Sequence, residues 1–573
     1  MLQQLLHIII ISCICIIWGL PLYSLFLHRR NEGFFTEGFG KIITLFFSGI
    51  LTLSFLSSWM ILFFPLKFIY LLAGTVVLLI SFMILSKKNN ELTAVKISKL
   101  PFIAFLFSVT CILLFILLGA AKPANPDTHI YHLQIIRWAN EYGTVPGLAN
   151  LYPRFGLGSN WFNLVSLFYI PVFPHQNFTF LNNTITIWFL LWLLSKWHKH
   201  YLLSTADRLH KSFTLFYFLL IVYCLFDWQL FRDASNSTSY DFIVTALTLM
   251  VICYLVENNF IYRDKNFSLF LCFLTLSIIP FKLSGIFILL ILLVYLLQFR
   301  TIKLWLQAAI AGILIITPLL IKNHINTGYP LFPATFSISS PGWQLPVEMT
   351  KNMNAYIMKG NKFYNYPTSF MNAQDTTTFN WIPFWIKNVL PRHKVLLILS
   401  LLSFVIFFFN PIKQENLRRF RFLFGAAWLM LIGWFFTAPD PRFAFGILLF
   451  LASFPLCLLF AHLLNRRIYL LLMAIAILPV IGYGYMKTKT IDDAKVLLEP
   501  VNIENPVYKT ETKNGIELHN TRVNNDWMCP CVFTTLPCFG ENNPFVKPRS
   551  TDLSDGFYMD PKPDSSFIKN YNY

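Results

Sequence analysis

Residues 3–27 read QQLLHIIIISCICIIWGLPLYSLFL, and this stretch decides the fold class. It contains no Asp, Glu, Lys or Arg, and it exceeds the roughly 20 apolar residues that a helix needs to cross a bilayer. Further apolar runs follow it, and no small-residue cleavage site does. The stretch is therefore predicted to be a first transmembrane helix rather than a removed signal peptide.

The composition of the whole chain points to the same class. Of the 573 residues, 56% are hydrophobic, 17% are aromatic and only 13% are charged. A soluble globular protein needs a more polar surface than this composition supplies. The formal net charge of +18 is dispersed through short loops rather than gathered on one soluble domain, which argues against a nucleic-acid partner. We expect an all-α polytopic membrane protein.

Apolar runs of spanning length recur along most of the chain. About fourteen transmembrane helices are predicted, near residues 3–27, 42–64, 66–86, 100–120, 177–195, 212–231, 241–257, 268–281, 284–299, 304–321, 394–410, 422–438, 443–463 and 468–484. The run 161–173 is short and ends among prolines, so an interfacial or re-entrant element is predicted there.

Lys and Arg are distributed unevenly between the two sets of alternating short loops. One set holds roughly three times as many as the other, which places that set in the cytoplasm and both termini outside. The predicted organisation is a four-span region, a first large outer loop with interfacial helices, a middle bundle, a second large outer loop, a second four-span region and a small outer tail; their ranges are 1–120, 121–176, 177–322, 323–393, 394–484 and 485–573.

The ten cysteines divide into two groups. Seven fall in predicted spans, where a thiol serves as a small apolar packing group. Cys529, Cys531 and Cys538 lie in the tail. An oxidising compartment permits one disulfide among these three, and the odd number leaves the pairing open. A zinc site is disfavoured because no histidine lies close by in the sequence.

The first outer loop contains the main candidate for catalysis. Asp127 follows a predicted span in the sequence NPDTHIYHLQ. It is placed either to cap the helix that ends near Gly143 or to act as a general base at the membrane boundary. His129 and His132 are spaced to share one helix face. They could hold a divalent metal together with Asp127, but stacking on, or hydrogen bonding to, a polar substrate is the favoured use.

Basic residues stand at the outer ends of several other predicted helices. Arg154 either holds a lipid headgroup or clamps a substrate phosphate, with Asn160 nearby in the same loop. Lys282 is a charge near membrane depth, for which snorkelling to the surface is the alternative. Together these residues argue for an anionic ligand in a cavity open to the outer leaflet; they are Arg154, Lys282, Lys322 and Arg442.

Acidic residues near these positions allow further interpretations. Asp233 and Asp241 supply a possible second acid in a short outer loop, although helix capping is the favoured use of both. Arg442 follows Asp440 in the turn APDPRF and could form an internal ion pair with it. The sequence lacks a P-loop, a GxSxG elbow, an HExxH motif and a dinucleotide fingerprint, so a nucleotide-dependent reaction is not expected.

Three segments resemble a group of bacterial multi-span membrane proteins near the GT-C superfamily of membrane glycosyltransferases. They are PDTHIYHLQIIRWANEYGTVPGLANLYPRFGLGSN (126–160), NHINTGYPLFP (323–333) and APDPRF (438–443). The resemblance implies an inverting transfer of a sugar from a polyprenyl-phosphate donor to a glycan, lipid or protein acceptor. It further implies the periplasmic face of a bacterial inner membrane, with periplasmic termini and bound membrane lipids.

Carried onto this sequence, the resemblance gives Asp127 the role of the acid that activates the acceptor hydroxyl. Lys282 and Arg442 then bind and neutralise the leaving phosphate. The sequence departs from the superfamily because three additional spans precede this loop, and because Thr128 stands where many members have a second acid. That departure weakens the metal assignment, and no cofactor is expected.

Two other function classes fit the same sequence. A transporter or flippase for an anionic lipid-linked glycan would share the ligand, although such proteins usually contain internal repeats with broken helices at the midplane. A polysaccharide polymerase or ligase would share the donor and the membrane setting. An essential arginine pair with a dispensable Asp127 would favour the polymerase or ligase.

Overall fold

The structure is a computed structural model of the whole chain. Apart from isolated positions at 123 and between 465 and 482, it describes residues 2–27, 38–86, 102–120, 125–170, 177–203, 208–227, 234–258, 264–299, 301–363, 378–409, 415–463, 506–522, 531–540 and 543–571.

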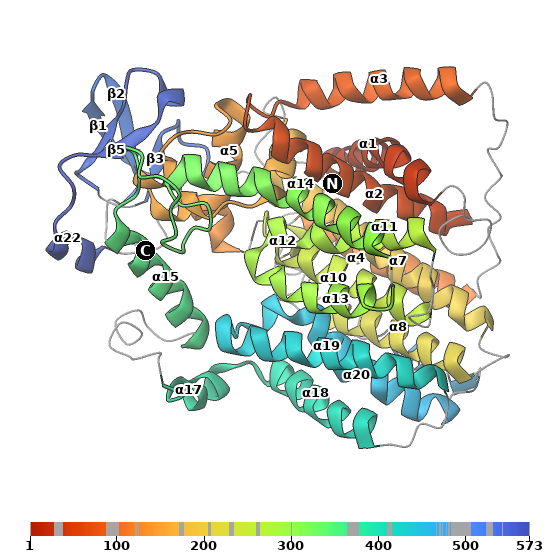
Figure 1. Ribbon diagram of the computed structural model, residues 1–573. Coiled ribbons are helices and arrows are strands. Elements are labelled where there is room, and N and C mark those ends of the chain that lie inside the picture. Colours follow the sequence, from red (N-terminus) through yellow and green to blue (C-terminus); the bar gives the residue numbers. More distant parts are fainter. Residues whose placement is uncertain are drawn as a thin grey trace.

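Helices make up most of the described structure (Figure 1). The longer ones are α1 (Leu2–Phe26), α2 (Gly38–Met60), α3 (Phe68–Ser86), α4 (Phe102–Ala120), α7 (Phe180–Leu203), α8 (Arg208–Phe226), α10 (Asp241–Glu257), α11 (Lys265–Leu276), α14 (Ile302–Thr327), α15 (Val347–Lys362), α18 (Pro391–Phe409), α19 (Glu415–Thr437) and α20 (Phe445–Phe460). The short α helices are α5 (Leu133–Glu141), α6 (Asn160–Phe168), α12 (Ile278–Phe281), α13 (Leu289–Leu296), α17 (Trp381–Asn388) and α22 (Ser565–Asn570).

One short π-helix and several short 3-10 helices connect these elements. They are the π-helix η1 (Thr128–His132) and the 3-10 helices η2 (Leu148–Asn150), η3 (Pro153–Gly156), η4 (Asn177–Thr179), η5 (Leu283–Ile288), η6 (Pro441–Phe443), η7 (Ala461–Leu463) and η9 (Leu553–Asp555).

The chain is a multi-pass membrane protein by the length and apolarity of its helices. Six of the described helices are long and apolar enough to cross a membrane, namely α1, α2, α8, α14, α19 and α20. A seventh span results if α17 and α18, which meet at a bend of 116°, count as one. The prediction of about fourteen spans was therefore wrong. Many apolar runs form helices shorter than a bilayer is thick, such as Phe68–Ile84, Phe105–Ile116 and the pair on either side of Lys282.

The run predicted as interfacial or re-entrant contains α6, whose nine residues are all buried inside the protein. At nine residues it is too short to span a membrane, as the sequence predicts. The predicted span 468–484 lies largely outside the described residues.

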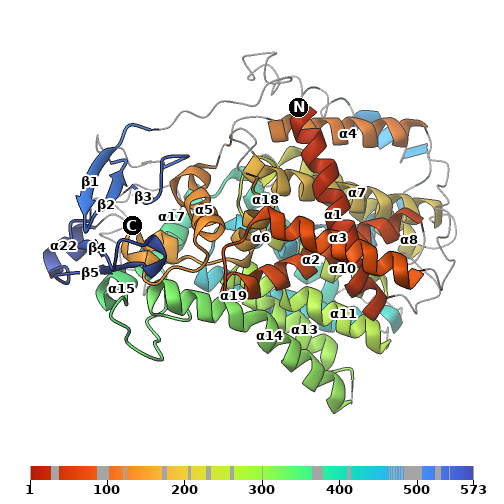
Figure 2. The ribbon, with the colours of Figure 1, turned by 90° about the horizontal axis from the view of Figure 1, so that it is seen from above.

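Close backbone packing joins the first two helices. A Cβ at Gly19 would lie 1.9 Å from the carbonyl oxygen of Leu45, and one at Gly49 would lie 1.8 Å from that of Cys15. Only glycine permits this approach, because any side chain would collide with backbone. The two helices therefore form one tightly packed layer, which is the red pair in Figures 1 and 2.

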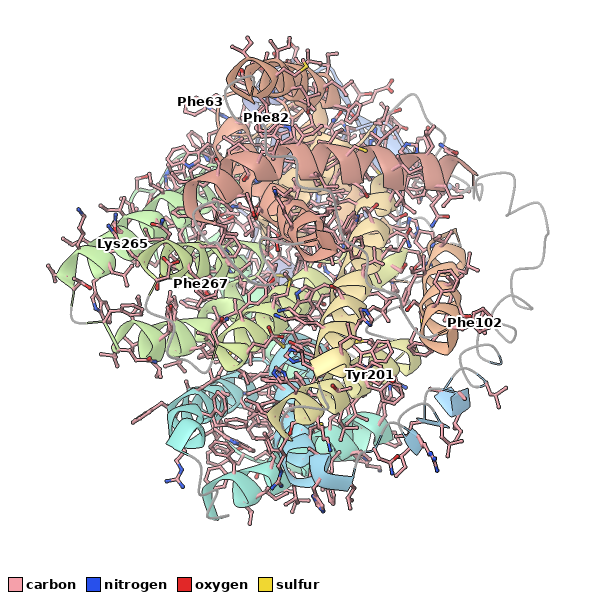
Figure 3. All side chains as sticks on the ribbon, turned by 90° about the vertical axis from the view of Figure 1, so that its right-hand side faces the viewer. Phe63, Phe82, Phe102, Tyr201, Lys265 and Phe267 are labelled. Carbon is pink, nitrogen blue, oxygen red and sulfur yellow. A yellow bond between two sulfur atoms is a disulfide. The ribbon has the colours of Figure 1, made fainter. Side chains whose placement is uncertain are left out.

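The large segments between and after the long apolar helices gather at one end of these helices, which we call the loop face. α5, α15, α17, α22 and the β-strands all lie there (Figures 1 and 2). The start of α1 lies near the same end, since Gln4 donates hydrogen bonds to Ile116 O and Asn183 Oδ1, both 2.9 Å away. Figure 3 shows the opposite end, where Lys265 begins α11 and Tyr201 lies near the end of α7.

The tail folds into two small sheets on the loop face. β1 (Lys509–Lys513) pairs antiparallel with β2 (Ile516–Asn520), which pairs parallel with β3 (Cys538–Phe539). β4 (Val546–Pro548) and β5 (Phe557–Met559) form an antiparallel hairpin. Cys531 and Cys538 form a disulfide, which settles the pairing left open by the sequence for these two; Cys529 lies outside the described residues. The other seven cysteines are free thiols.

Candidate functional site

One cavity of about 420 Å³ opens at the loop face. The first large loop, which includes residues 125–160, lines one wall and α15 lines another, while the ends of α10, α12 and η6 close the remaining side. The residues that line it include His132 and the four charged residues Asp127, Arg154, Lys282 and Arg442 from the sequence analysis. Side chains separated by more than 300 residues thus meet in one space.

Asp127 lies at the start of the π-helix η1. Its φ of −57° and ψ of −28° are helical, and its side chain makes no capping hydrogen bond, so the capping interpretation was wrong. Instead, Asn125 Oδ1 accepts a hydrogen bond of 3.0 Å from the Asp127 backbone N–H. The Asp127 carboxylate is 33% exposed in the cavity. It is therefore both anchored through its backbone and open to a ligand.

Arg154 crosses from the first wall of the cavity to the second. Its guanidinium lies 3.6 Å from the Asp127 carboxylate and donates a hydrogen bond of 3.1 Å to the hydroxyl of Tyr356 on α15. The rings of Tyr131, Tyr152 and Tyr356 lie within 5.9 Å of it, which is the range of a cation–π interaction. Pro153 begins η3 and fixes this turn.

Asp241 is the centre of a second charged group. Its carboxylate lies 2.5 Å from Lys282 Nζ and 3.9 Å from Arg442 Nε. Arg442 Nε also lies 2.7 Å from the carboxylate of Asp440, whose Oδ1 accepts a hydrogen bond from the Arg442 backbone. The internal ion pair considered for the APDPRF turn is thus present, and it extends to a carboxylate at the start of α10.

The backbone explains how Lys282 reaches this group. It stands in extended conformation, with φ of −154° and ψ of 123°, between α12 and η5. Its Nζ lies 2.9 Å from the centroid of the Phe443 ring and 5.2 Å from that of Tyr240. Burial lowers the pKa of Lys282 to about 8, while Asp241 favours the charged form. The lysine is held inside the protein and does not snorkel to the surface.

Asp241 has a larger role than its place in the sequence indicates. Helix capping was the favoured use of this residue, but the N-cap of α10 is Tyr240, and Asp241 is the first residue of the helix. The ion pairs of Asp241 are with residues 41 and more positions later in the chain, so no local pattern announces them. Asp233, the other acid considered, lies outside the described residues.

His132 and His129 take different positions. His132 lines the cavity among the rings of Tyr131, Phe162 and Tyr240, and its Nδ1 lies 3.1 Å from Thr238 Oγ1. Burial lowers its pKa to about 4, so the imidazole is neutral at pH 7. His129 is not among the lining residues and lies against Phe178. The wider turn of a π-helix breaks the shared face that three-residue spacing gives in an α-helix.

Two other predicted ligand residues also lie away from the cavity. Lys322 is 2% exposed on α14, where its Nζ donates a 2.5 Å hydrogen bond to Asn163 Oδ1. Asn160 is the first residue of α6 and is 2% exposed. Neither lines the cavity. Within the described ranges, no group of three His, Cys, Asp or Glu residues is arranged to hold a metal ion.

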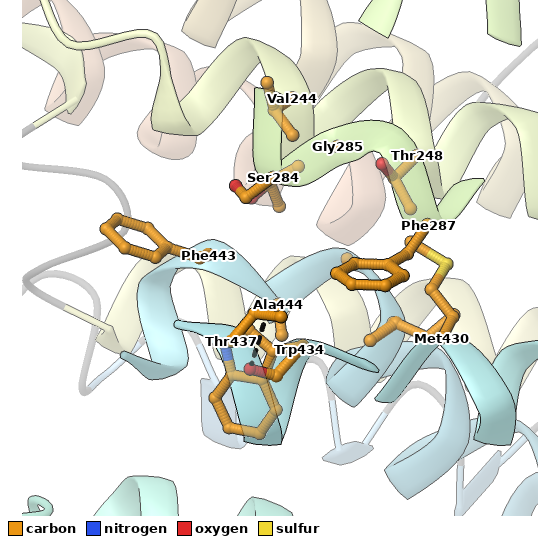
Figure 4. Close-up of a pocket in the computed structure, with 13 residues that line it drawn as sticks. Val244, Thr248, Ser284, Gly285, Phe287, Met430, Trp434, Thr437, Phe443 and Ala444 are labelled. Carbon is orange, nitrogen blue, oxygen red and sulfur yellow. Dashed lines mark hydrogen bonds between the residues drawn. The ribbon is translucent and has the colours of Figure 1, made fainter. Parts of the chain in front are cut away.

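A second, smaller hollow adjoins the cavity (Figure 4). It has a volume of about 20 Å³ and lies among α10, η5, α19 and the start of α20. Its walls are mainly apolar, with Val244, Phe287, Met430 and Trp434 among them. Ser284 and Phe443 line both spaces, so the charged cavity has an apolar neighbour inside the helix bundle.

The fold and the cavity define a class, which is a multi-pass helical membrane protein with a charged, aromatic-lined cavity at one end. The chain belongs to the family described as a domain of unknown function (DUF8201), which matches residues 1–449. No curated protein and no solved structure matches it. The family match carries no glycosyltransferase assignment.

Proposed function

We propose that the chain is an inverting glycosyltransferase that moves a sugar from a polyprenyl-phosphate donor to a hydroxyl of a glycan, lipid or protein acceptor. The observation that carries the proposal is the meeting of Asp127, Arg154, Lys282 and Arg442 in one cavity at the end of apolar helices. The loop face would then be the periplasmic face of a bacterial inner membrane, as the distribution of Lys and Arg indicates.

The lining of the cavity suits a sugar phosphate. Six aromatic side chains border it, and aromatic faces pack well against the apolar face of a sugar ring; they are Tyr131, Tyr240, Phe281, Phe332, Tyr356 and Phe443. Carboxylates accept hydrogen bonds from sugar hydroxyls, and the cations meet a phosphate. The cavity also lies at the ends of the apolar helices α10 and α12. Charged groups beside apolar helices favour an amphipathic donor over a free sugar.

The chemistry follows from the positions of the charges. Asp127 takes the proton from the acceptor hydroxyl, whose oxygen forms a bond to the anomeric carbon from the face opposite the phosphate. The bond from that carbon to the phosphate oxygen breaks, and the polyprenyl phosphate leaves with the electron pair. Lys282 and Arg442 stabilise the charge that develops on it. Arg154 orients Asp127 through the 3.6 Å ion pair.

The substitution Asp127→Asn tests the reaction. In the full chain in lipid nanodiscs, supplied with polyprenyl-phosphate sugars extracted from bacterial membranes, mass spectrometry would follow the release of free polyprenyl phosphate. Loss of general-base catalysis is expected to slow release by about 10²-fold or more. Glu348→Gln, on the exposed side of α15, is the matched control and should leave release unchanged.

Two outcomes would contradict the proposal in different ways. Near-normal release by Asp127→Asn would remove Asp127 from the role of base. Absence of release by the unaltered chain, with the donor moved intact between leaflets, would point to a flippase instead.

A further inference from the structure

The C-terminal tail contacts both of the loops that wall the cavity. It lies beyond the part of the chain that the family match covers, which ends at residue 449. Its described residues nevertheless pack on the first loop and on α15 (Figures 1 and 2). Each set of contacts joins segments more than two hundred residues apart in the sequence.

The first set involves the disulfide-closed segment 531–538, which we call the strap. Its backbone makes hydrogen bonds along the helix that carries Asp127 and His132. Cys531 N–H donates to His129 O at 3.3 Å, Gln134 Nε2 donates to Val532 O at 2.9 Å, and Arg137 Nη1 donates to Thr534 O at 2.6 Å. Val532 also packs with Leu133 and Phe178. The strap therefore follows the helix for two turns.

The second set joins the β4–β5 hairpin to the segment 146–150 of the same loop. Phe557 N–H donates to Pro146 O at 3.0 Å, and Asn150 Nδ2 donates to Phe557 O at 3.3 Å. The contact requires glycine on both sides. A Cβ at Gly147 would lie 2.1 Å from Phe557 O, and one at Gly556 would lie 1.9 Å from Pro146 O. A side chain at either position would collide with a backbone carbonyl oxygen, so this close approach of the two segments requires glycine at both positions.

The third set reaches the second wall. Asn352 on α15 donates a hydrogen bond of 3.3 Å to the Ile568 carbonyl of α22. Arg549 lies 4.7 Å from the Trp343 ring, in the segment that leads into α15. α15 is the element that presents Tyr356 to Arg154 across the cavity. The tail thus bridges the two walls from outside.

We propose that the tail is a brace that sets the separation of the two cavity walls, and that the Cys531–Cys538 disulfide locks it in place. The disulfide closes a segment of seven positions, which limits the conformations open to the strap and favours the one that fits the helix. The cavity should then keep its shape only in an oxidising compartment. This inference does not depend on which reaction the cavity performs.

Hydrogen exchange of the full chain in nanodiscs, read by mass spectrometry, tests the brace. Replacing the disulfide by Cys531→Ser with Cys538→Ser, or reducing it, is expected to speed exchange about tenfold or more in residues 128–141 and 347–362. Cys13→Ser, which removes an exposed free thiol, is the matched control. Peptides of α20, on which the strap has no hydrogen bond, should not change and serve as an internal reference.

A second variant reaches the brace without altering the disulfide. Gly556→Val places a side chain against Pro146 O, whereas Gly515→Val changes a tail glycine whose Cβ would meet only Thr551 at 3.7 Å. Both glycines have positive φ, 88° and 79°, so both variants put strain on the tail backbone, but only the first collides with the loop. Only Gly556→Val should speed exchange in the two walls. Unchanged exchange there after confirmed reduction of the disulfide would overturn the proposal, even if Gly556→Val failed to fold.

Discussion

At the scale of single residues, every cation in the cavity faces a carboxylate. Arg154 pairs with Asp127, Lys282 with Asp241, and Arg442 with Asp440 and Asp241. The sequence suggested a surplus of positive charge, because basic residues at helix ends are visible along the chain while their partners are not. An anionic ligand must therefore compete with Asp241 for Lys282 and Arg442.

This competition leads to a test with Asp241→Asn. Removing one partner of a buried ion pair leaves the other charge uncompensated, so unfolding should become easier by about 3 kcal/mol. A short-chain prenyl monophosphate supplies a replacement anion. It should raise the midpoint of thermal unfolding more in the variant than in the unaltered chain.

The matched control for that experiment is Asp227→Asn. Asp227 is also buried, with Arg392 Nε at 3.2 Å and His393 Nε2 at 3.1 Å, but it does not line the cavity. We expect the same loss of stability without rescue by prenyl monophosphate. Equal rescue of both variants, or of neither, would show that the phosphate does not bind Lys282 and Arg442.

The low pKa of His132 leads to a prediction of how stability depends on pH. Its pKa is lowered from 6.5 to about 4 in the folded chain because burial disfavours the imidazolium. The unfolded chain then binds more protons between these values, so stability is full above pH 6.5 and falls as the pH drops toward 4. The free energy of unfolding should fall by about 3 kcal/mol in all between pH 6.5 and pH 4.

Thermal unfolding of the chain and of His132→Asn between pH 7.5 and 5 measures this contribution. The variant should lose stability less steeply with acid, while His462→Asn, at an exposed site, should follow the unaltered chain. Parallel curves for the chain and His132→Asn would contradict the prediction, because they would mean that His132 has the same pKa in the folded and the unfolded chain.

At the scale of elements, the sequence predicted helices well and spans poorly. Hydrophobicity shows that a run such as 284–299 is apolar. It does not show that the helix before this run ends at Lys282, or that the run itself consists of η5 followed by α13. The length of each continuous helix depends on packing between helices. The site residues were found because polar side chains at the ends of apolar runs are conspicuous. The ion pairs of Asp241 and the orientation of Lys322 were not predicted, because both depend on partners distant in the sequence.

The contact between α14 and α6 gives a prediction of its own. Lys322 is buried, its hydrogen bond is to Asn163, and it does not line the cavity. Replacing a buried charge by an apolar side chain of similar length is often neutral or stabilising. Lys322→Met should therefore keep or raise the midpoint of thermal unfolding and keep the release of polyprenyl phosphate.

Asn163→Leu is the converse change, because it removes the acceptor and leaves the ammonium buried without it. A loss of about 1–3 kcal/mol is expected, and Lys322→Met in the same chain should restore most of it. Loss of activity in Lys322→Met with unchanged stability would return Lys322 to the ligand site.

At the scale of the whole molecule, both ends of the chain lie at the loop face. Gln4 contacts residues at the end of α4 and the start of α7, and the tail packs on the first loop and α15. Lys265 begins α11, which runs through α12 to Lys282 in the cavity, so it lies at the opposite end (Figure 3). Two ends on one face require an even number of crossings, and the outside is the side that the distribution of Lys and Arg predicts for both termini.

Cysteine labelling in whole cells tests this arrangement. In a chain carrying Cys13→Ser, the exposed positions Ser565 and Lys265 would each be replaced by cysteine and treated with a membrane-impermeant maleimide. We expect Ser565→Cys to react in intact cells and Lys265→Cys to react only after the membrane is opened. The reverse pattern would place the cavity in the cytoplasm, where the disulfide would be reduced and the brace unlocked. It would also separate Asp127 from donors on the outer leaflet, so one experiment bears on the topology, the proposed reaction and the brace together.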